Sequence, residues 1–321
     1  MSPRILLTGA SSFSGFWFAK VLAEQGFQVT ALLQKKQLAD YSGVRKQRIE
    51  NLSDKNLGIE LVFDCPLGSS KTIALLKEKK HWDFLGLHGA FVTNYKSQDF
   101  DFLSALKNNI ENLEEVIKTF TQNQGQHLIH TGTVFESNEG VGNAPLKAAS
   151  PYGLSKNLTN EVIKFYCERH RIKMGKFVLA NPFGTFEEEK LTTYLMRSWI
   201  QDQTPTMSFP DYIRDNIHVE LLAKVYAHFC LQLKSSESSY LKINPSGYVE
   251  SQGSFTLRFA NEMTSRLQKK CSVTIAKQSQ FTEPYMRINT DPATHLITDW
   301  DEKKAWDQIA SDYQEKYRHT S

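Results

Sequence analysis

The chain has 321 residues, of which 40% are hydrophobic and 23% are charged. These values indicate a folded chain of one large or two ordinary domains, and they exclude global disorder, a fibrous rod and a small disulfide-stapled scaffold. The 38 basic and 35 acidic side chains leave a net charge of +3, too small to indicate nucleic acid or a membrane surface as a partner.

The cysteine pattern and the lack of long apolar runs predict a cytoplasmic protein. The four cysteines are scattered without a CxxC pair, so zinc ribbons and redox motifs are not expected. The N-terminal apolar run, Ile5–Leu7, is far too short for a signal sequence, and no run approaches the ~20 residues that span a bilayer. His81, His127 and His170 lack metal-ligand spacing, so no metal is predicted.

Short apolar runs alternate with longer amphipathic stretches through the first 180 residues. The expected strands are Ile5–Leu7, Val29–Leu33, Leu61–Phe63, Phe84–His88, His127–His130 and Lys176–Ala180. The expected helices are Phe16–Gln25, ended by a left-handed cap at Gly26, then Thr72–Lys80, Asp101–Asn123 and Tyr152–His170. This alternation predicts βαβ units with right-handed crossovers, and therefore an α/β fold with a parallel sheet covered on both faces.

After Asn181 the alternation becomes irregular and prolines recur. We expect a first domain over residues 1–180 and a smaller α/β C-terminal lobe over residues 181–321, with residues 214–243 returning to the first domain. No flexible linker separates them, so the two lobes are expected to pack closely with a cleft between them.

The segment Thr8–Gly15, TGASSFSG, follows the first strand and opens the first helix. Gly9 allows a tight turn close to a pyrophosphate, and Gly15 allows close helix–strand packing, with the phosphates at the helix N-terminus. An ordinary βα turn is the alternative. Ser12 stands where a middle glycine is usual, so it must adopt a permitted φ or change the loop. The candidate cofactor residues are Gly9, Ser11, Ser12, Phe13 and Gly15.

The end of the second strand favours NADP(H) over NAD. An NAD site usually has an acid there to bind the ribose diol, but this strand runs into Gln34, Lys35 and Lys36. Arg45, Lys46 and Arg48 follow nearby. Basic side chains without an acid suit a 2′-phosphate, and a solvated basic loop is the alternative.

A YxxxK pattern, Tyr152 to Lys156, opens a predicted helix after Ser150-Pro151. The i, i+4 spacing places both side chains on one helix face, where an ammonium beside a phenol is expected to lower the phenol pKa for proton transfer. One such pattern is expected by chance, so its context matters. The pattern follows the fifth strand and its end segment Thr131-Gly132-Thr133-Val134-Phe135, and a hydroxyl at that strand end can reach the same cleft as Tyr152.

Several ordered segments together resemble the extended short-chain dehydrogenase/reductase family. The resemblance is closest to its NAD(P)-dependent epimerase/dehydratase branch, which acts on nucleotide sugars, and it covers about residues 4–317. The segments are Thr8–Gly15, His88–Ala90, Asn109, Thr131, Tyr152–Lys156, Asn181–Gly184, Arg214–Val219, Arg287–Asp291 and Trp300. The resemblance implies a Rossmann doubly wound parallel sheet that binds the dinucleotide, and a smaller C-terminal lobe that binds the nucleotide sugar.

The resemblance also implies roles for single residues. Tyr152 is the acid/base on the sugar oxygen, Lys156 holds the nicotinamide ribose, and Thr131 hydrogen-bonds the reacting oxygen. Asn109 supports the site from the long helix, and a plain solvated helix residue is the alternative. The further cofactor contacts are Lys35, Lys36, Asp64 near the adenine and His88, although His88 and His218 also suit structural roles. The expected substrate contacts are Asn181, Thr133 and Arg214, the last at the diphosphate.

The same resemblance narrows the reaction. Family 4,6-dehydratases carry Asp-Glu after the catalytic threonine, but this chain has Gly132 and Thr133, which disfavours dehydration. An NADPH-dependent reductase of a nucleotide-linked keto-sugar, at C4 of a deoxy sugar, is the first expectation, with Tyr152 as proton donor. A 4-epimerase with tightly bound NAD is the alternative, and a non-catalytic NADP sensor is less favoured because Tyr152 and Lys156 are both present. A homodimer is expected through the two long helices, which carry extra apolar side chains.

Overall fold

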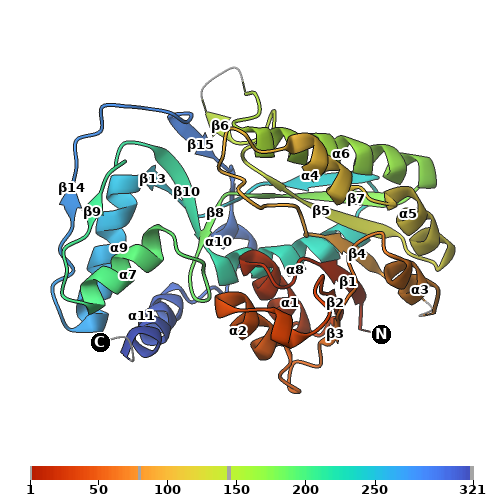
Figure 1. The fold of residues 1–321 in the computed structure, drawn as a ribbon, viewed down its shortest axis with the longest axis horizontal. Coiled ribbons are helices and arrows are strands. Elements are labelled where there is room, and N and C mark those ends of the chain that lie inside the picture. Colours follow the sequence, from red (N-terminus) through yellow and green to blue (C-terminus); the bar gives the residue numbers. More distant parts are fainter. Residues whose placement is uncertain (1, 79–80, 143–145, 319–321) are drawn as a thin grey trace.

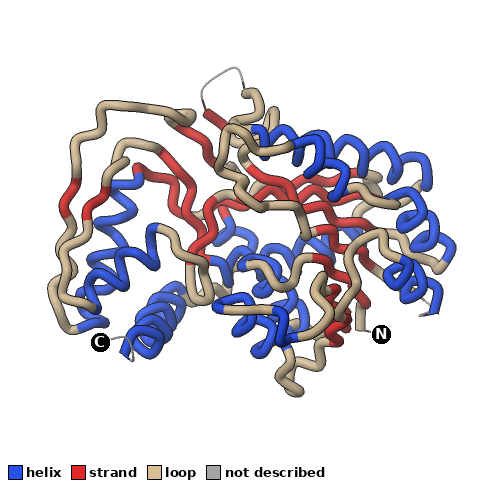
Figure 2. The backbone as a smooth tube through the Cα atoms, viewed as in Figure 1, coloured by secondary structure: helices blue, strands red, loops and turns tan. Residues whose placement is uncertain are grey.

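The structure, a computed structural model, describes residues 2–78, 81–142 and 146–318. Its centre is a seven-stranded parallel sheet with helices on both faces (Figures 1 and 2). The strand order is β11-β7-β5-β4-β1-β2-β3. The strands are β1 Arg4–Thr8, β2 Gln28–Leu32, β3 Glu60–Val62, β4 Phe84–Leu87, β5 His127–Thr133, β7 Lys173–Leu179 and β11 Tyr240–Ile243. This doubly wound sheet confirms the expected fold class.

Two helical layers cover the sheet, and the side-chain period of two assigns alternate residues to each layer. Ile5, Leu7 and Phe177 pack with α1 and α8, whereas Leu6 and Met174 pack with α3, α5 and α6. The helices of this part are α1 Phe13–Glu24, α2 Gly43–Leu52, α3 Ser70–Glu78, α4 Phe102–Asn109, α5 Leu113–Gln122, α6 Pro151–His170 and α8 Val219–Ser235, with a 3-10 turn at Leu38–Asp40. Helix α1 ends before Gly26, which has φ +83° as expected for the cap. Lys80, the expected end of the helix that begins at Thr72, lies outside the described residues.

The single long helix expected over Asp101–Asn123 is wrong, because this stretch forms two helices, α4 and α5. Asn112 has φ 48° in the left-handed region and donates its side-chain amide to Gly68 O at 2.8 Å. A Cβ on Gly68 would lie 2.0 Å from Glu111 O, so the loop before α3 fits closely against the break. Both helices have apolar faces that meet the rest of the domain, so hydrophobic periodicity alone did not reveal the break.

A second, five-stranded sheet organises the C-terminal lobe. Its strands are β6 Val141–Gly142, β8 Asn181–Phe183, β10 Ile213–His218, β13 Tyr248–Ser251 and β15 Met286–Ile288. Short two-stranded pairs join β9 Thr206–Met207 to β14 Thr274–Ile275, and β12 Pro245–Ser246 to β16 Asp291–Pro292. The helices are α7 Leu191–Ile200, α9 Gln252–Leu267, α10 Ala293–Leu296 and α11 Glu302–Arg318. Phe183, Trp199, Phe259 and Trp306 form the aromatic centre of its core.

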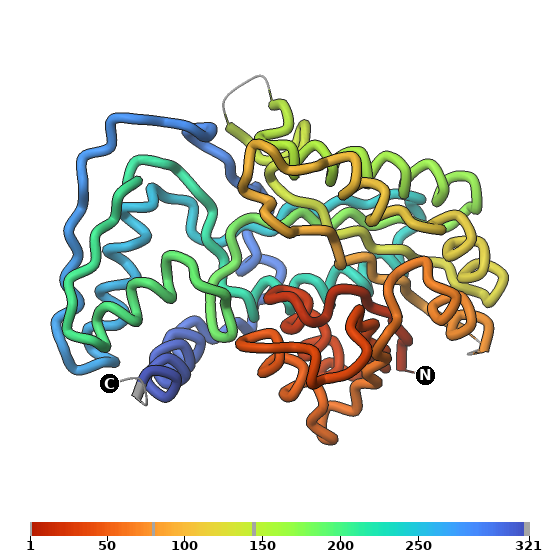
Figure 3. Tube along the Cα trace, viewed as in Figure 1, coloured from red at the N-terminus to blue at the C-terminus, as the bar shows by residue number. Residues whose placement is uncertain are grey.

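The chain crosses between the two sheets more than once, as the trace in Figure 3 shows. Residues 213–218 belong to the second sheet as β10, whereas α8 packs against α1 and β11 pairs in parallel with β7. The return to the first sheet that was expected over 214–243 therefore begins at Val219. Asn181, at the start of β8, follows β7 after one residue, so the first sheet leads directly into the second.

All four cysteines are buried and free, at Cys65, Cys167, Cys230 and Cys271. Within the described part of the chain, no helix is both long and apolar enough to cross a membrane.

Candidate active site

The glycine-rich segment after β1 forms a tight loop that excludes side chains at two positions. Gly9 has φ +77°, and a Cβ there would lie 2.7 Å from Gly89 N. A Cβ on Gly15 would lie 2.2 Å from Gly9 O, so the first turn of α1 sits directly on the loop. Ser12 adopts the permitted φ of −76° and caps the helix: its hydroxyl accepts from Gly15 N at 3.2 Å and donates to Gly9 O at 2.7 Å. Of the two alternatives for Ser12, the permitted φ is therefore the one observed.

Arg48 on α2 is buried and hydrogen-bonds the glycine-rich loop, so it is not a surface cation. Its guanidinium is fully buried and donates to Ser11 O at 3.1 Å, to Phe186 O at 2.9 Å and to the Glu188 carboxylate at 2.6 Å. The expectation that Arg48 adds to a phosphate-binding cluster is therefore wrong, because every one of these contacts holds it inside the protein. The neighbouring Phe13 ring is buried as well, 5.7 Å from the Arg48 guanidinium.

The end of β2 presents two exposed lysines, and of these Lys35 has contacts with other described residues. The Lys35 ammonium hydrogen-bonds to Asp40 O and lies 5.1 Å from the centre of the Tyr41 ring. Lys36 is exposed. Asp64, exposed and in the left-handed region at φ 53°, donates its amide to Lys35 O at 2.8 Å. The end of β3 therefore lies beside the end of β2. The Asp64 carboxylate is thus close in the chain trace to Lys35 and Lys36.

His88, directly after β4, joins the glycine-rich loop to β5. Its Nε2 lies 3.1 Å from the hydroxyls of both Ser12 and Ser14, and its Nδ1 lies 3.1 Å from Thr131 Oγ1. Burial, and secondarily the charge of Lys156, lowers the pKa of His88 to about 3, so the ring is neutral. A neutral imidazole has one N–H, so it donates either to Thr131 or to a serine, but not to both. Sequence reasoning found His88 but not this bridging position.

Tyr152 and Lys156 lie on one face of α6, one turn apart, as the spacing predicts. Ser150 caps the helix by accepting from Gly153 N at 3.1 Å. Lys156 is 3% exposed, and the Tyr152 ring packs edge-on against the rings of Tyr95 and Phe100 at 5.2 and 5.9 Å. Neither the Tyr152 hydroxyl nor the Lys156 ammonium hydrogen-bonds a residue within the described ranges. Both groups therefore have hydrogen-bonding capacity left for a ligand.

The expected lowering of the Tyr152 pKa by Lys156 is wrong for this structure. Burial raises the Tyr152 pKa, and the charges of Glu136 and Tyr95 raise it further. Burial also lowers the Lys156 pKa to about 8, against the opposing effect of Glu136. Desolvation is the largest effect on the pKa of both groups, because each charged form loses water in the interior.

The fifth strand runs three residues further than expected, to Thr133. Thr131 is therefore inside the strand, 2% exposed, with its hydroxyl against His88. Thr133 lies on the same face two residues later, at the strand end. Asn109 at the end of α4 accepts from Phe91 N at 2.9 Å and donates to Thr159 at 3.2 Å. It thus ties the loop after β4 to α6.

The two expected substrate residues of the second lobe have different surroundings. Asn181 begins β8 and is half-buried. The Arg214 guanidinium donates to the carbonyls of Pro284 and Tyr285 at 3.0 and 3.1 Å, and pairs with the exposed Glu283 carboxylate at 3.0 Å. The structure therefore holds Arg214 within its own lobe, facing a carboxylate that a diphosphate would have to replace.

Sequence reasoning missed two buried charged residues under α6, Glu136 and Lys176. Their side chains form an ion pair at 2.7 Å on the face of β5 and β7 that α6 covers. The available signal was a lysine within a strand that is buried on both faces, where apolar residues are the norm. The expected strand began at Lys176, which hid this signal, whereas β7 begins at Lys173.

The comparisons with known proteins agree with this geometry. Residues 5–241 match the model of the NAD dependent epimerase/dehydratase family. The chain belongs to this family. It is thereby a nicotinamide-dinucleotide-dependent enzyme of the short-chain dehydrogenase type, as the sequence motifs indicated. No curated protein sequence matches the chain.

Several solved structures resemble the whole chain at low sequence identity. The UDP-Glc/GlcNAc 4-epimerase from Campylobacter jejuni is 19% identical, with a TM-score of 0.72 over 98% of this chain and all of that one. The UDP-N-acetylglucosamine 4-epimerase from Methanobrevibacter ruminantium, in complex with UDP-N-acetylmuramic acid, is 16% identical, with a TM-score of 0.73 over the same shares. The UDP-glucuronic acid 4-epimerase from Bacillus cereus, in complex with UDP-glucuronic acid and NAD, is also 16% identical, with a TM-score of 0.70 over these shares. These similarities confirm the fold.

Proposed function

We propose that this protein is a nucleotide-sugar 4-epimerase that works with NAD. The observation that carries the proposal is the Tyr152–Lys156 pair, whose polar atoms hydrogen-bond no described residue, on α6 beside the glycine-rich loop. Family membership and the three 4-epimerase structures support the reaction class. Gly132 and Thr133 offer no acid/base pair for dehydration, which leaves chemistry at C4.

The proposed roles follow from the positions of the side chains. Bound NAD would supply reversible hydride transfer at C4 of the sugar. Gly9, Ser11, Ser12, Gly15 and His88 form or support the loop that would hold its phosphates, since helix N-termini bind anions. Tyr152 takes the proton of the C4 hydroxyl and gives it back, while the Lys156 ammonium stabilises the phenolate. Thr133, at the strand end, and Thr131 supply hydroxyls on one face of β5. Asn181 and Arg214 bind the nucleotide part.

The reaction is tested directly with purified protein. UDP-glucose, UDP-N-acetylglucosamine and UDP-glucuronic acid are each incubated with it, and the products are separated and analysed by NMR for inversion at C4. The protein is also denatured, and the nucleotide that it releases is identified. Stoichiometric NAD and C4 inversion without net change at 340 nm are expected. Protein that purifies without nucleotide and inverts none of these sugars would contradict the proposal.

A second candidate is an NADPH-dependent reductase of a nucleotide-linked 4-keto sugar. Two observations favour it: β2 ends in exposed Lys35 and Lys36 instead of an acid, and burial keeps the Tyr152 phenol protonated, as a proton donor requires. Replacing Lys35 and Lys36 together by glutamate should weaken NADPH binding at least tenfold and NADH binding much less, because charge-assisted bonds to a 2′-phosphate are lost. Equal effects on both cofactors, measured by fluorescence titration, would remove this candidate.

The protein is proposed to act as a homodimer. Leu103 on α4 and Phe165 on α6 are 63% and 58% exposed, although both belong to helices that already bury one face. Large apolar side chains at such positions are typical of a helix-mediated interface. Light scattering at micromolar concentration should give twice the 36.7 kDa chain mass, and a monomer would contradict the expectation.

A further inference from the structure

On the face of the sheet beneath α6, three neighbouring strands carry a row of ionisable side chains, where a parallel sheet is usually apolar. His130 on β5 is opposite Lys176 on β7, and Lys176 is opposite Lys242 on β11. His130 and Lys176 are 2% and 3% exposed, whereas the Lys242 side chain is 39% exposed at the sheet edge. Burying such groups is costly unless they are paired, so their presence calls for a reason.

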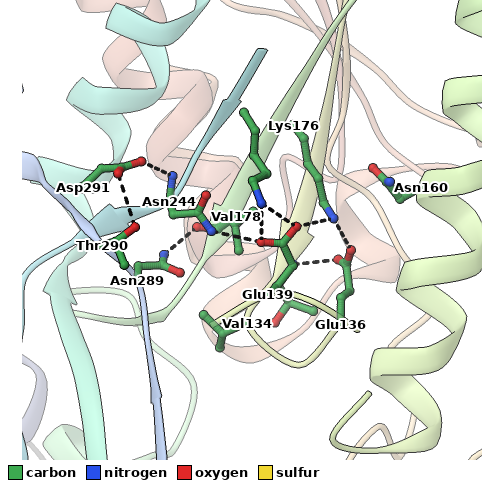
Figure 4. A network of polar contacts seen from close by, with 12 residues as sticks. Val134, Glu136, Glu139, Asn160, Lys176, Val178, Asn244, Asn289, Thr290 and Asp291 are labelled. Carbon is green, nitrogen blue, oxygen red and sulfur yellow. Dashed lines mark hydrogen bonds and ion pairs between the residues drawn. The ribbon is translucent and has the colours of Figure 1, made fainter. Parts of the chain in front are cut away.

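Two carboxylates from the loop after β5 complete this row. Glu136, fully buried, lies 2.7 Å from the Lys176 ammonium, and Glu139 lies 2.8 Å from the same ammonium. Glu139 also accepts from Lys242 at 3.2 Å and from Asn244 at 3.0 Å. Figure 4 shows Lys176 between the two glutamates, with Glu139 joined to Asn244. The charges alternate in sign from the interior towards the edge.

Gly132 leaves room for the inner end of the row. A Cβ at this position would lie 2.8 Å from Glu136 Oε1 and 2.9 Å from Lys176 Cε. The carboxylate therefore occupies the space of a missing side chain, one residue after Thr131. It is held there by Thr133 N, which donates to Glu136 Oε1 at 2.8 Å.

Polar atoms lie on the side of this group that faces α6. The side-chain oxygen of Asn160 on α6 is buried without a hydrogen-bond partner among the described residues, and Glu136 Oε2 lies in the ion pair with Lys176. The first turn of α6 lies directly on the loop that carries Glu136: a Cβ on Gly153, next to Tyr152, would lie 2.1 Å from the carbonyl oxygen of Phe135, which precedes Glu136.

We propose that Glu136 is a positioning residue for the Tyr152–Lys156 pair: its buried carboxylate, held in place by Lys176, is the counter-charge to the Lys156 ammonium. Glu139 and Lys242 anchor Lys176 from the outer side. The charge of Glu136 raises the pKa of both Tyr152 and Lys156, whereas Glu139 is not among the groups that shift either one. The proposal rests on the proposed function only for its catalytic consequence.

Several other ionisable groups face the pair and must be kept constant in any test. They come from β4 and its following loop, from β5, from β7 and from α6 itself: His88, Tyr95, His130, Lys176 and Tyr152. Both histidines have a pKa lowered by burial, so they stay neutral across the range in which Lys156 titrates.

The test compares two isosteric variants, Glu136→Gln and Glu139→Gln. Each removes one carboxylate charge from Lys176 and leaves the other, so the two are matched for their effect on the anchoring network. The Lys156 pKa is read from the 13Cε shift of labelled lysines as a function of pH, with Lys156→Arg for assignment. This measurement needs no substrate, so it stands even where the epimerase assay fails.

Glu136→Gln should lower the Lys156 pKa from about 8 by about one unit, whereas Glu139→Gln should leave it within about 0.3 unit. In the epimerase assay, the alkaline limb of the kcat profile, where Lys156 loses its proton, should move to lower pH for Glu136→Gln alone, with KM unchanged. If both variants leave the Lys156 pKa unchanged, or shift it equally, Glu136 only holds the loop after β5 in position. Should Glu136→Gln fail to fold, Glu136→Asp, which withdraws the charge by one methylene, should give a smaller shift of the same sign, and no shift would overturn the proposal.

Discussion

The two faces of the seven-stranded sheet are built on different principles. The face under α1 and α8 is an aromatic and aliphatic core, in which Phe177 contacts the rings of Phe18, Tyr226 and Phe229. The face under α6 starts equally apolar, at Leu128 and Met174, but becomes ionic towards the carboxyl ends of the strands. Both sides of the sheet thus carry an apolar core, and the α6 side adds buried charges.

The largest effect is expected on the charged side, at the proposed acid/base. Tyr152→Phe removes one proton donor and little volume, so turnover should fall by 10²–10⁴-fold while nucleotide binding persists. Tyr166→Phe, on the same helix, is the matched control and should keep nearly full turnover. A Tyr152→Phe enzyme with more than about a tenth of the wild-type rate would show that proton transfer does not depend on this hydroxyl.

The aromatic face is tested by Phe177→Ala. This ring is fully buried, so its removal should lower the free energy of unfolding by about 3–5 kcal/mol through lost transfer energy and a residual cavity. Urea denaturation measures the loss. A cost below about 1 kcal/mol would mean that this side is not the rigid core described above.

The adjacent residue of the same strand tests the ionic face. Lys176→Met should cost about 3 kcal/mol, because it leaves Glu136 and Glu139 buried without their shared cation. Adding Glu136→Gln and Glu139→Gln to it should recover most of that loss, since no unpaired charge then remains. The triple variant is compared with Lys176→Met by urea denaturation, and a further loss of stability would show that the layer depends on its charges for folding.

The smallest effect is expected at the sheet's other end, where Asp83 accepts from Arg4 N at 2.8 Å and from Lys234 at 2.7 Å. Burial opposes ionisation of Asp83, but the Lys234 and Arg4 contacts outweigh it, so the pKa is lowered. Asp83→Asn should therefore cost about 1 kcal/mol at neutral pH, a value reduced by the exposure of Lys234. The stabilisation is present above the unfolded-state pKa of about 4 and is lost as pH falls through the lower folded-state value. Thermal unfolding from pH 7 to pH 2 should show the two proteins converging, and a constant difference would contradict this.

The sequence predicts the apolar half of this architecture well and the ionic half poorly. Strands such as Ile5–Leu7 and the glycine-rich segment carry local signals, namely an apolar run and two glycines, that physical rules can interpret. The break at Asn112 depends on a contact with Gly68, distant in sequence, and Arg48 is indistinguishable from a solvated cation until Phe186 and Glu188 are placed beside it. Such positions are decided by tertiary contacts, which no local pattern contains.

The position of Lys176 shows the same limit within the candidate site. Tyr152, Lys156 and Thr131 were found because a spacing and a resemblance mark them, whereas Glu136 and Lys176 meet only after β5, β7 and the following loop are assembled. The Tyr152 pKa was expected to fall because its distance to Lys156 along the helix was known. The burial of Tyr152, which decides the direction of its pKa shift, depends on tertiary packing that the spacing does not contain.

Arg48 connects two parts of the chain that the family resemblance treats separately. A single guanidinium contacts the backbone of the glycine-rich loop at Ser11 and the second lobe at Phe186 and Glu188. Because the two segments share this side chain, a ligand that orders the glycine-rich loop is expected to slow hydrogen exchange around Phe186 and Glu188 as well.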